Sequence, residues 1–173
     1  YGAPGKTVVV YFFGGAATPA LDMPTPRAEI VAALNESVDK INRIEIMRAQ
    51  VEDLRKAHGS NRQIDQALAA IYKRMYDTEL HYLSRTEMHS DDKWYVEKYK
   101  LYLNLVWLLG EVGGQASDVA GGVGYRPTQA SQNVFRDLSQ QLETAGTDFN
   151  RLMQEVEAFN TAHAGRLPPI SDK

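Results

Sequence analysis

Residues 128–163 read TQASQNVFRDLSQQLETAGTDFNRLMQEVEAFNTAH, and this stretch decides the fold class. Its apolar residues recur mostly at alternating steps of three and four, which places them on one face of an α-helix. A stripe of this length is typical of helices that pack in a bundle. Pro127-Thr128 predicts the helix start, and Leu167-Pro168-Pro169-Ile170 predicts its end and an extended tail. The stripe is formed by Val134, Leu138, Leu142, Ala145, Phe149, Leu152, Val156, Phe159 and His163.

Two earlier stripes predict an antiparallel helical hairpin. The first helix is expected to begin at Thr25-Pro26 and to close at His58-Gly59, where glycine suits a left-handed cap. Ser60 and Gln63 form a capping-box pair for the second helix. The single residue at the junction favours a tight turn between the helices. The first stripe is Ile30, Leu34, Val38, Ile41, Ile44, Met47, Val51 and Leu54, and the second is Ile64, Leu68, Ile71, Met75, Thr78 and Tyr82.

A third helix is predicted over residues 92–112, after a polar turn at 86–92 and before a glycine-rich loop at 113–125. It carries two apolar stripes, so it is expected to touch two neighbours and to lie at the centre of the core. One stripe is Tyr95, Tyr99, Tyr102, Val106 and Leu109, and the other is Leu101, Leu105, Leu108 and Val112. The predicted fold class is therefore mainly α, an antiparallel bundle of about four long helices.

One β-strand is predicted before the bundle, at residues 7–13 with the sequence TVVVYFF. It is bounded by Pro4-Gly5 and Gly14-Gly15, and it is apolar on both faces, which suits a buried strand. A lone strand cannot satisfy its own backbone groups. We therefore expect it to add to a sheet in a preceding domain or another chain, with Val8, Val10 and Phe12 as candidate partner-binding residues. The predicted organisation is a strand and linker at 1–24 and a helical bundle domain at 25–173.

The composition narrows the classes of function. The 173 residues carry 19 basic and 22 acidic side chains, a net charge of -3, so there is no basic excess to attract nucleic acid. The absence of cysteine excludes disulfides and thiolate sites. We find no signal peptide, and the most apolar run, 101–109, is too short to span a bilayer. Because residue 1 is Tyr, we expect a processed form or a fragment.

No motif for catalysis, a cofactor or a metal ion emerges from the sequence. Glu79, His81, Glu87, His89, Asp91 and Asp92 are close together in the chain, but their spacing fits no helical metal motif such as HExxH. A solvated helix end is the favoured interpretation. The glycine-rich loop contains no phosphate-binding pattern. His163 is expected to interact with the last carbonyls of its helix. We therefore predict no catalytic residue, no cofactor and no metal ligand.

Aromatic residues of the third helix form the second candidate partner-binding surface. Tyr95, Tyr99 and Tyr102 recur at steps of four and three, and Trp107 follows them. Tyrosine and tryptophan are enriched in protein interfaces, although ordinary core packing also explains such a stripe. The same side chains could instead line a pocket for a small ligand between the helices.

The second half of the chain carries an ordered pattern that resembles a known family. The pattern runs from Leu101-Tyr102-Leu103-Asn104-Leu105-Val106-Trp107-Leu108 through Ser117-Asp118, Pro127-Thr128-Gln129, Val134-Phe135-Arg136-Asp137-Leu138 and Phe159-Asn160 to Leu167-Pro168-Pro169-Ile170. It is similar to the C-terminal helical region of bacterial sortilin-like BNR-repeat β-propeller proteins, often described as glycosyl hydrolases. The resemblance implies helical hairpins after an extended stretch with a Pro-Gly turn, and an exported, periplasmic or extracellular location.

This resemblance carries over no catalytic residue, because the chain lacks the propeller to which glycosidase chemistry would belong. The leading hypothesis is therefore a non-enzymatic structural or protein-interaction module that braces a larger exported or membrane-associated assembly. Its partner is expected to be a protein or a preceding domain. The alternatives are a supporting C-terminal fragment of a sialidase-like glycosidase and a bundle with a small-ligand pocket.

Overall fold

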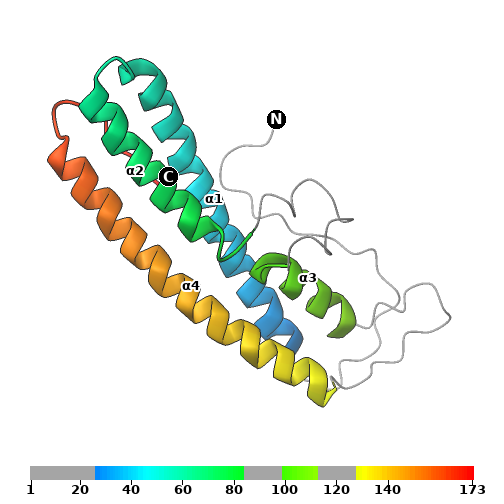
Figure 1. Cartoon of the computed structure of the whole chain (residues 1–173). Helices are drawn as coiled ribbons and strands as arrows, with labels where there is room; N and C mark the ends of the chain where they lie inside the picture. The colour runs from blue at the N-terminus through cyan, green and yellow to red at the C-terminus, as the bar shows by residue number, and fades with distance from the viewer. Residues whose placement is uncertain (1–25, 84–98, 113–127) are drawn as a thin grey trace.

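The computed structural model describes residues 26–83, 99–112 and 128–173, which form four α-helices (Figure 1). These are α1 (Pro26–His58), α2 (Arg62–Glu79), α3 (Leu101–Val112) and α4 (Gln129–Ala162). The prediction of a mainly helical chain is confirmed for these residues. The predicted strand at 7–13 lies outside them, as do the polar turn at 86–92, the start of the predicted third helix and the glycine-rich loop at 113–125.

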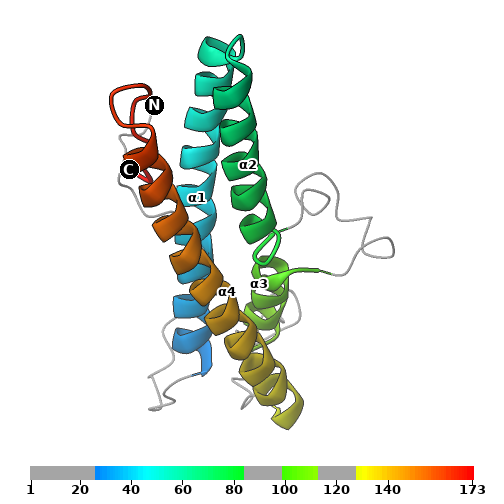
Figure 2. The same cartoon turned by 60° about the vertical axis from the view of Figure 1, so that its left-hand side comes forward.

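Two long helices frame the molecule, and two shorter ones fill its two halves. At 33 and 34 residues, α1 and α4 are each about 50 Å long. They contact each other, and each of them also contacts both α2 and α3, whereas α2 and α3 do not touch. Figure 2 shows α2 beside one half of the frame and α3 beside the other. The bundle therefore has three helices at each level, with α2 and α3 in turn supplying the third.

The chain just after α2 lies directly beside the first turn of α3. The backbone N–H of Tyr102, in the first turn of α3, donates a hydrogen bond of 2.9 Å to the carbonyl of Tyr82, just after α2. Residues 99 and 100 are not helical, so α3 begins at Leu101 instead of the predicted residue 92. The tyrosine spacing alone does not determine where the helix begins.

The turn from α1 into α2 is tight, as predicted, but it is one residue longer than predicted and has different capping, because Gly59 and Ser60 both precede the N-cap of α2. Asn61, and not Ser60, is the N-cap of α2, and its side chain accepts hydrogen bonds from the N–H groups of Gln63 and Ile64. Asparagine is as effective an N-cap as serine, so the sequence alone did not separate them. Gly59 does not adopt the predicted left-handed conformation. It is needed for space, because a Cβ there would lie 2.8 Å from the carbonyl oxygen of Arg55.

The buried apolar residues form two clusters, one in each half. The upper core joins the second half of α1 to α2, the second half of α4 and the tail that follows it. The lower core joins the first half of α1 to α3 and the first half of α4. The upper core is Ile44, Met47, Val51, Leu54, Leu68, Ile71, Met75, Phe149, Leu152, Val156, Leu167 and Ile170. The lower core is Ile30, Ala33, Ile41, Tyr82, Leu83, Leu101, Leu105, Leu108, Leu138, Leu142 and Ala145.

Most residues of each predicted stripe are buried or half-buried, but one residue of α3 and one of α4 are exposed instead. The stripe Leu101, Leu105 and Leu108 is fully inside, as expected for a helix in the core. Val106, from the other predicted stripe of α3, is 38% exposed, and Val134 of α4 is 46% exposed. A helix packed against a frame of two others buries one broad face, so the second stripe of α3 lies at its edge, where Tyr102 and Leu109 pack partly against the lower core and Val106 is exposed. Among the described residues, no helix is long and apolar enough to cross a membrane.

The ends of α4 match their predictions. Thr128 is the N-cap, and its hydroxyl accepts a hydrogen bond of 3.1 Å from the N–H of Ser131. His163 caps the other end, with its Nδ1 lying 3.0 Å from the carbonyl oxygen of Phe159 and its ring stacked on the Phe159 ring at 4.3 Å. The predicted interaction of this histidine with a terminal carbonyl is thus confirmed.

Truncation on the two sides of α3 tests the burial of its inner face. We expect Leu105→Ala to lower the free energy of unfolding by about 2–5 kcal/mol, because it leaves a cavity in the lower core. Val106→Ala, one residue along, should cost less than about 1 kcal/mol because that side chain is partly in water. Chemical denaturation of both variants measures the difference. Equal small losses would place α3 outside the core.

Alanine substitution at two glycines should have opposite effects. Gly59→Ala should destabilise the protein by about 1–3 kcal/mol, since its Cβ would overlap the backbone of Arg55. Gly110→Ala should stabilise it by about 0.5–1 kcal/mol, because this position is helical and a Cβ there meets no atom within 4 Å. Thermal unfolding of the two variants provides the comparison, and a stabilising Gly59→Ala would contradict the steric argument.

Candidate interaction surface

The residues predicted to bind a partner are only partly placed by the described structure. Val8, Val10, Phe12 and Tyr95 lie outside the described residues. Tyr99 and Tyr102 are half-buried at the start of α3, where Tyr102 packs against the lower core. The Tyr99 carbonyl accepts a hydrogen bond of 2.9 Å from the side-chain amide of Asn104, which fixes the entry into the helix. These two tyrosines therefore border the outer face of α3.

The most exposed large apolar side chain of the described residues is Trp107, on the outer side of α3. It is 65% accessible to solvent, and Val106 and Val134 beside the same concavity are also exposed. The concavity has a volume of about 630 Å³ and lies between α3 and the first turns of α4. Its lining is Asn104, Val106, Trp107, Leu108, Gly110, Glu111 and Val134. Of the four aromatic residues proposed from the sequence to line a pocket, it includes Trp107 but neither Tyr99 nor Tyr102.

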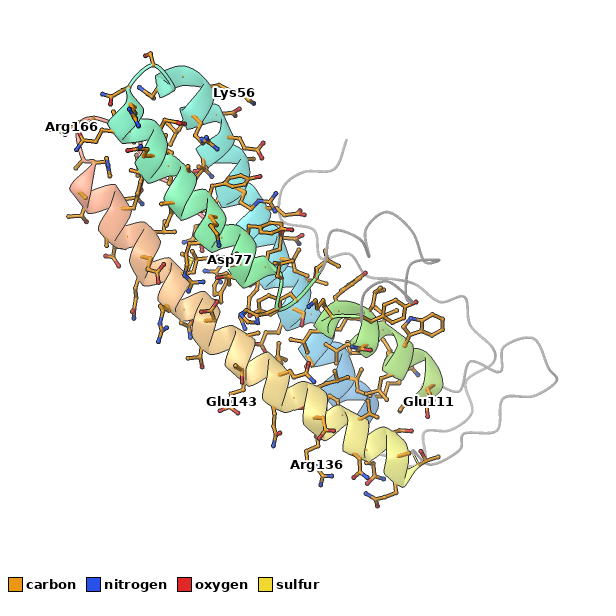
Figure 3. All side chains as sticks on the ribbon, in the orientation of Figure 1. Lys56, Asp77, Glu111, Arg136, Glu143 and Arg166 are labelled. Atoms are coloured by element: carbon orange, nitrogen blue, oxygen red, sulfur yellow. The ribbon has the colours of Figure 1, made fainter. Side chains whose placement is uncertain are left out.

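The walls of this concavity are held at a fixed spacing by a short polar chain. The hydroxyl of Ser131 in α4 donates a hydrogen bond of 2.8 Å to the Glu111 carboxylate at the end of α3. The hydroxyl of the N-cap Thr128 lies 2.8 Å from the same Ser131 oxygen. Figure 3 shows Glu111 where the end of α3 approaches the start of α4. One buried serine thus ties the two walls together beside the exposed tryptophan.

The polar side chains that line the concavity are already engaged in hydrogen bonds. It offers one carboxylate, Glu111, which already accepts a hydrogen bond from Ser131, and one side-chain amide, Asn104, which already donates to Tyr99. Its other side chains are apolar except for the indole N–H of Trp107. Exposed tryptophan next to smaller apolar residues is typical of the energetic centre of protein interfaces. We therefore take Val106, Trp107 and Val134 as the candidate interaction surface.

A second polar cluster, here called the Arg74 network, joins α2 to α4 between the two cores. Arg74 makes a bidentate pair with Asp148, at 2.8 and 3.0 Å, and its Nε donates to Glu155 at 2.9 Å. The buried hydroxyl of Thr78 donates to Asp148 at 2.9 Å, and His81 Nε2 lies 3.6 Å from the same carboxylate. The hydrogen bonds from Arg74 lower the pKa of Asp148 below its usual value. The network fixes the register of α2 on α4.

A buried ion pair joins α2 to α1 at the same level. The Arg48 guanidinium donates to the Glu79 carboxylate, which is almost fully buried, and also to the Tyr72 hydroxyl at 3.2 Å. The rings of Tyr72 and Tyr76 lie beside the guanidinium at 5.2 and 6.0 Å. Burial raises the pKa of Glu79, and Arg48 opposes this shift. Glu79 and His81 thus face different helices, and no group of three potential metal ligands occurs in the described segments.

The sequence contains all three residues of this surface, but its periodicity assigns them to two different roles. The sequence predicts Trp107 as a pocket residue and places Val106 and Val134 in stripes that face the core. Only the packing of α3 between α1 and α4 shows which stripe is covered.

Comparison with protein-family models, with curated proteins and with solved structures gave no match.

The pH dependence of stability should report on the Arg74 network. Because the pKa of Asp148 is lowered on folding, its charged form stabilises the protein above the unfolded value of about 3.9, and this contribution is lost as pH falls through the lower folded value. We expect Asp148→Asn to cost about 1–3 kcal/mol at neutral pH and progressively less below about pH 4. Urea denaturation at neutral and acidic pH measures this. Asp137→Asn, at an exposed position of α4, is the control, and a pH-independent loss would contradict the assignment.

Proposed function

We propose that this chain is a non-enzymatic helical module that braces a larger assembly by binding a protein partner through α3. The observation that carries the proposal is the exposed Trp107 beside the concavity formed with α4. Large apolar side chains cost free energy when they remain in water, and a patch of them rimmed by polar groups is typical of a contact site. The partner is a protein or a preceding domain of the same polypeptide.

The positions of the charged groups support a structural role. The buried and half-buried charges of the described residues are engaged in holding helices together, as in the pairs Arg74–Asp148 and Arg48–Glu79. The remaining ion pairs join neighbouring turns of one helix or adjacent elements. A catalytic carboxylate would need to lie in a cleft with its reacting oxygen accessible to substrate. Asp148 instead accepts hydrogen bonds at both oxygens from α2.

The predicted strand at 7–13 supplies the second proposed point of attachment. Its alternating Val8, Val10 and Phe12 would add to the edge of a sheet in the partner, a mode in which backbone hydrogen bonds give affinity. Two attachments to one partner reinforce each other, because the second forms at a high effective concentration. The resemblance that we predict from the sequence pattern, to the helical region of exported BNR-repeat proteins, motivates the proposal of a partner in an exported or membrane-associated assembly.

Site-specific photo-crosslinking in the source cells tests the proposal. A photoreactive residue at position 107 should form an adduct with an exported protein or with an upstream region of the same polypeptide, because α3 faces the partner. The control position is Gln140, exposed on α4 away from the concavity. Trp107→Ala should leave the free energy of unfolding within about 1 kcal/mol of the original while releasing the chain from its assembly. Equal crosslinking from both positions, or none, would contradict a partner surface at α3.

The identity of the adduct separates the leading proposal from its alternative. An adduct with a separate protein supports a free bracing subunit. An adduct within an upstream propeller of the same polypeptide supports the role of a supporting region in a sialidase-like glycosidase. Mass spectrometry of the crosslinked peptides distinguishes the two.

A further inference from the structure

The segment that follows α4 folds back over the frame instead of extending into solvent. Gly165 reverses the chain in a left-handed conformation with φ of 75°. Leu167 and Ile170 then enter the upper core, and Ile170 retains only 3% of its exposure, while Pro168 and Pro169 between them face solvent. Figure 2 shows this return of the chain beside the end of α4. Two apolar residues three positions apart thus anchor an extended segment.

Two side-chain amides recognise the backbone of this segment. Asn160 of α4 donates to the carbonyl of Ile170 at 2.8 Å and accepts from its N–H at 2.8 Å. Gln50 of α1 does the same for Ser171, at 2.7 and 2.9 Å. Each amide supplies one donor and one acceptor, so it satisfies a residue as a neighbouring β-strand would. Two successive residues are therefore held in extended form by the opposite walls of one groove.

The next residue is recognised by charge. The Arg43 Nε donates to the Asp172 carboxylate at 2.8 Å, and a second nitrogen of the guanidinium contacts the same oxygen. The ring of Phe149 lies 4.7 Å from this guanidinium, and Asp39 is 3.5 Å from it on the other side. Arg43 is thus held in place by its own surroundings, and it prefers an acidic residue at this position of the segment.

We propose that Arg43, Gln50, Asn160 and the adjoining upper core form a peptide-binding groove. Its ligand is an extended segment in which two apolar residues three positions apart are followed, two residues after the second, by an acidic residue. The residues 167–172 of this chain occupy it as a tethered ligand, which a segment of the same pattern displaces in trans. The Pro-Pro pair limits the freedom that such a segment loses on binding.

The placement of the groove supports exchange of its occupant. All three polar recognition groups belong to α1 and α4, which contact each other and α2 and α3 independently of the segment. Recognition through backbone groups tolerates other sequences at the solvent-facing positions. The groove lies in the upper half, whereas the surface around Trp107 lies in the lower half, so this proposal does not rest on the proposed function.

Displacement of the tethered segment tests the groove in the full chain. Ile170→Asp should expel the segment, and a fluorescent synthetic peptide of residues 165–173 should then bind the variant at least about tenfold more tightly than the original chain, whose own segment competes at high effective concentration. The peptide should also raise the melting temperature of the variant. Fluorescence anisotropy and thermal unfolding provide the two measurements.

Matched controls define the specificity. The same peptide carrying Ile170→Asp, or Asp172→Ala, should bind at least about tenfold more weakly, since each loses one anchor. A receptor with Asn160→Ala added to Ile170→Asp should also lose binding, and one with Glu157→Ala, at an exposed position of α4, should retain it. Ser171→Pro provides a milder receptor, because it removes the single N–H that donates to Gln50.

Either of two results would overturn the proposal. One is the absence of peptide binding at about 1 mM while the variants keep their helical circular dichroism, an affinity too weak for recognition. The other is loss of folding in both Ile170→Asp and Ser171→Pro. Either result would mean that residues 167–172 are a fixed part of the core and not an exchangeable ligand.

Discussion

The contact between α1 and α4 is the constraint on which every other described element depends. Each of these helices contributes residues to both core clusters, so each spans both halves of the molecule. The grooves that they form receive α2 in the upper half, α3 in the lower half and the segment 167–172 opposite α2. Without this frame, α3 would have no stable structure, because a helix of 12 residues is too short to persist alone in water.

Polar contacts between the cores determine how the pieces are aligned on the frame. Apolar packing alone tolerates a helix that slides by one turn, since leucine and isoleucine stripes look alike at each turn. The Arg74–Asp148 pair and the Arg48–Glu79 pair hold α2 against α4 and α1 at one register. Glu79 loses solvation when buried, so a misaligned α2 would leave its charge without a partner. Burying Glu79 thus costs some stability but favours a single alignment of α2 on the frame.

The sequence predicted the parts of the fold that depend on local periodicity. The stripe residues of α1, α2 and α4 are buried or half-buried as predicted, because each helix has one buried face, and Val134 is the exposed exception. α3 contacts two neighbours as predicted, but of the described residues in its second stripe Val106 is exposed, since periodicity does not show how far around the helix the neighbours reach. Trp107 carried a signal for the candidate surface, but its neighbour Val134 is in another helix. Gln50 and Ser171 are 121 residues apart, so no local pattern could have paired them.

The hydrogen bond from Tyr102 to the Tyr82 carbonyl has a consequence for how this fold tolerates change in length. The two residues are joined across 2.9 Å although 19 residues separate them along the chain. The positions of α2 and α3 are therefore independent of how much polypeptide connects them. Lengthening a connection costs only about 0.6 kcal/mol of closure entropy for each doubling. We therefore expect a longer connection between residues 83 and 99 to leave α2 and α3 in place on the frame at little cost in stability.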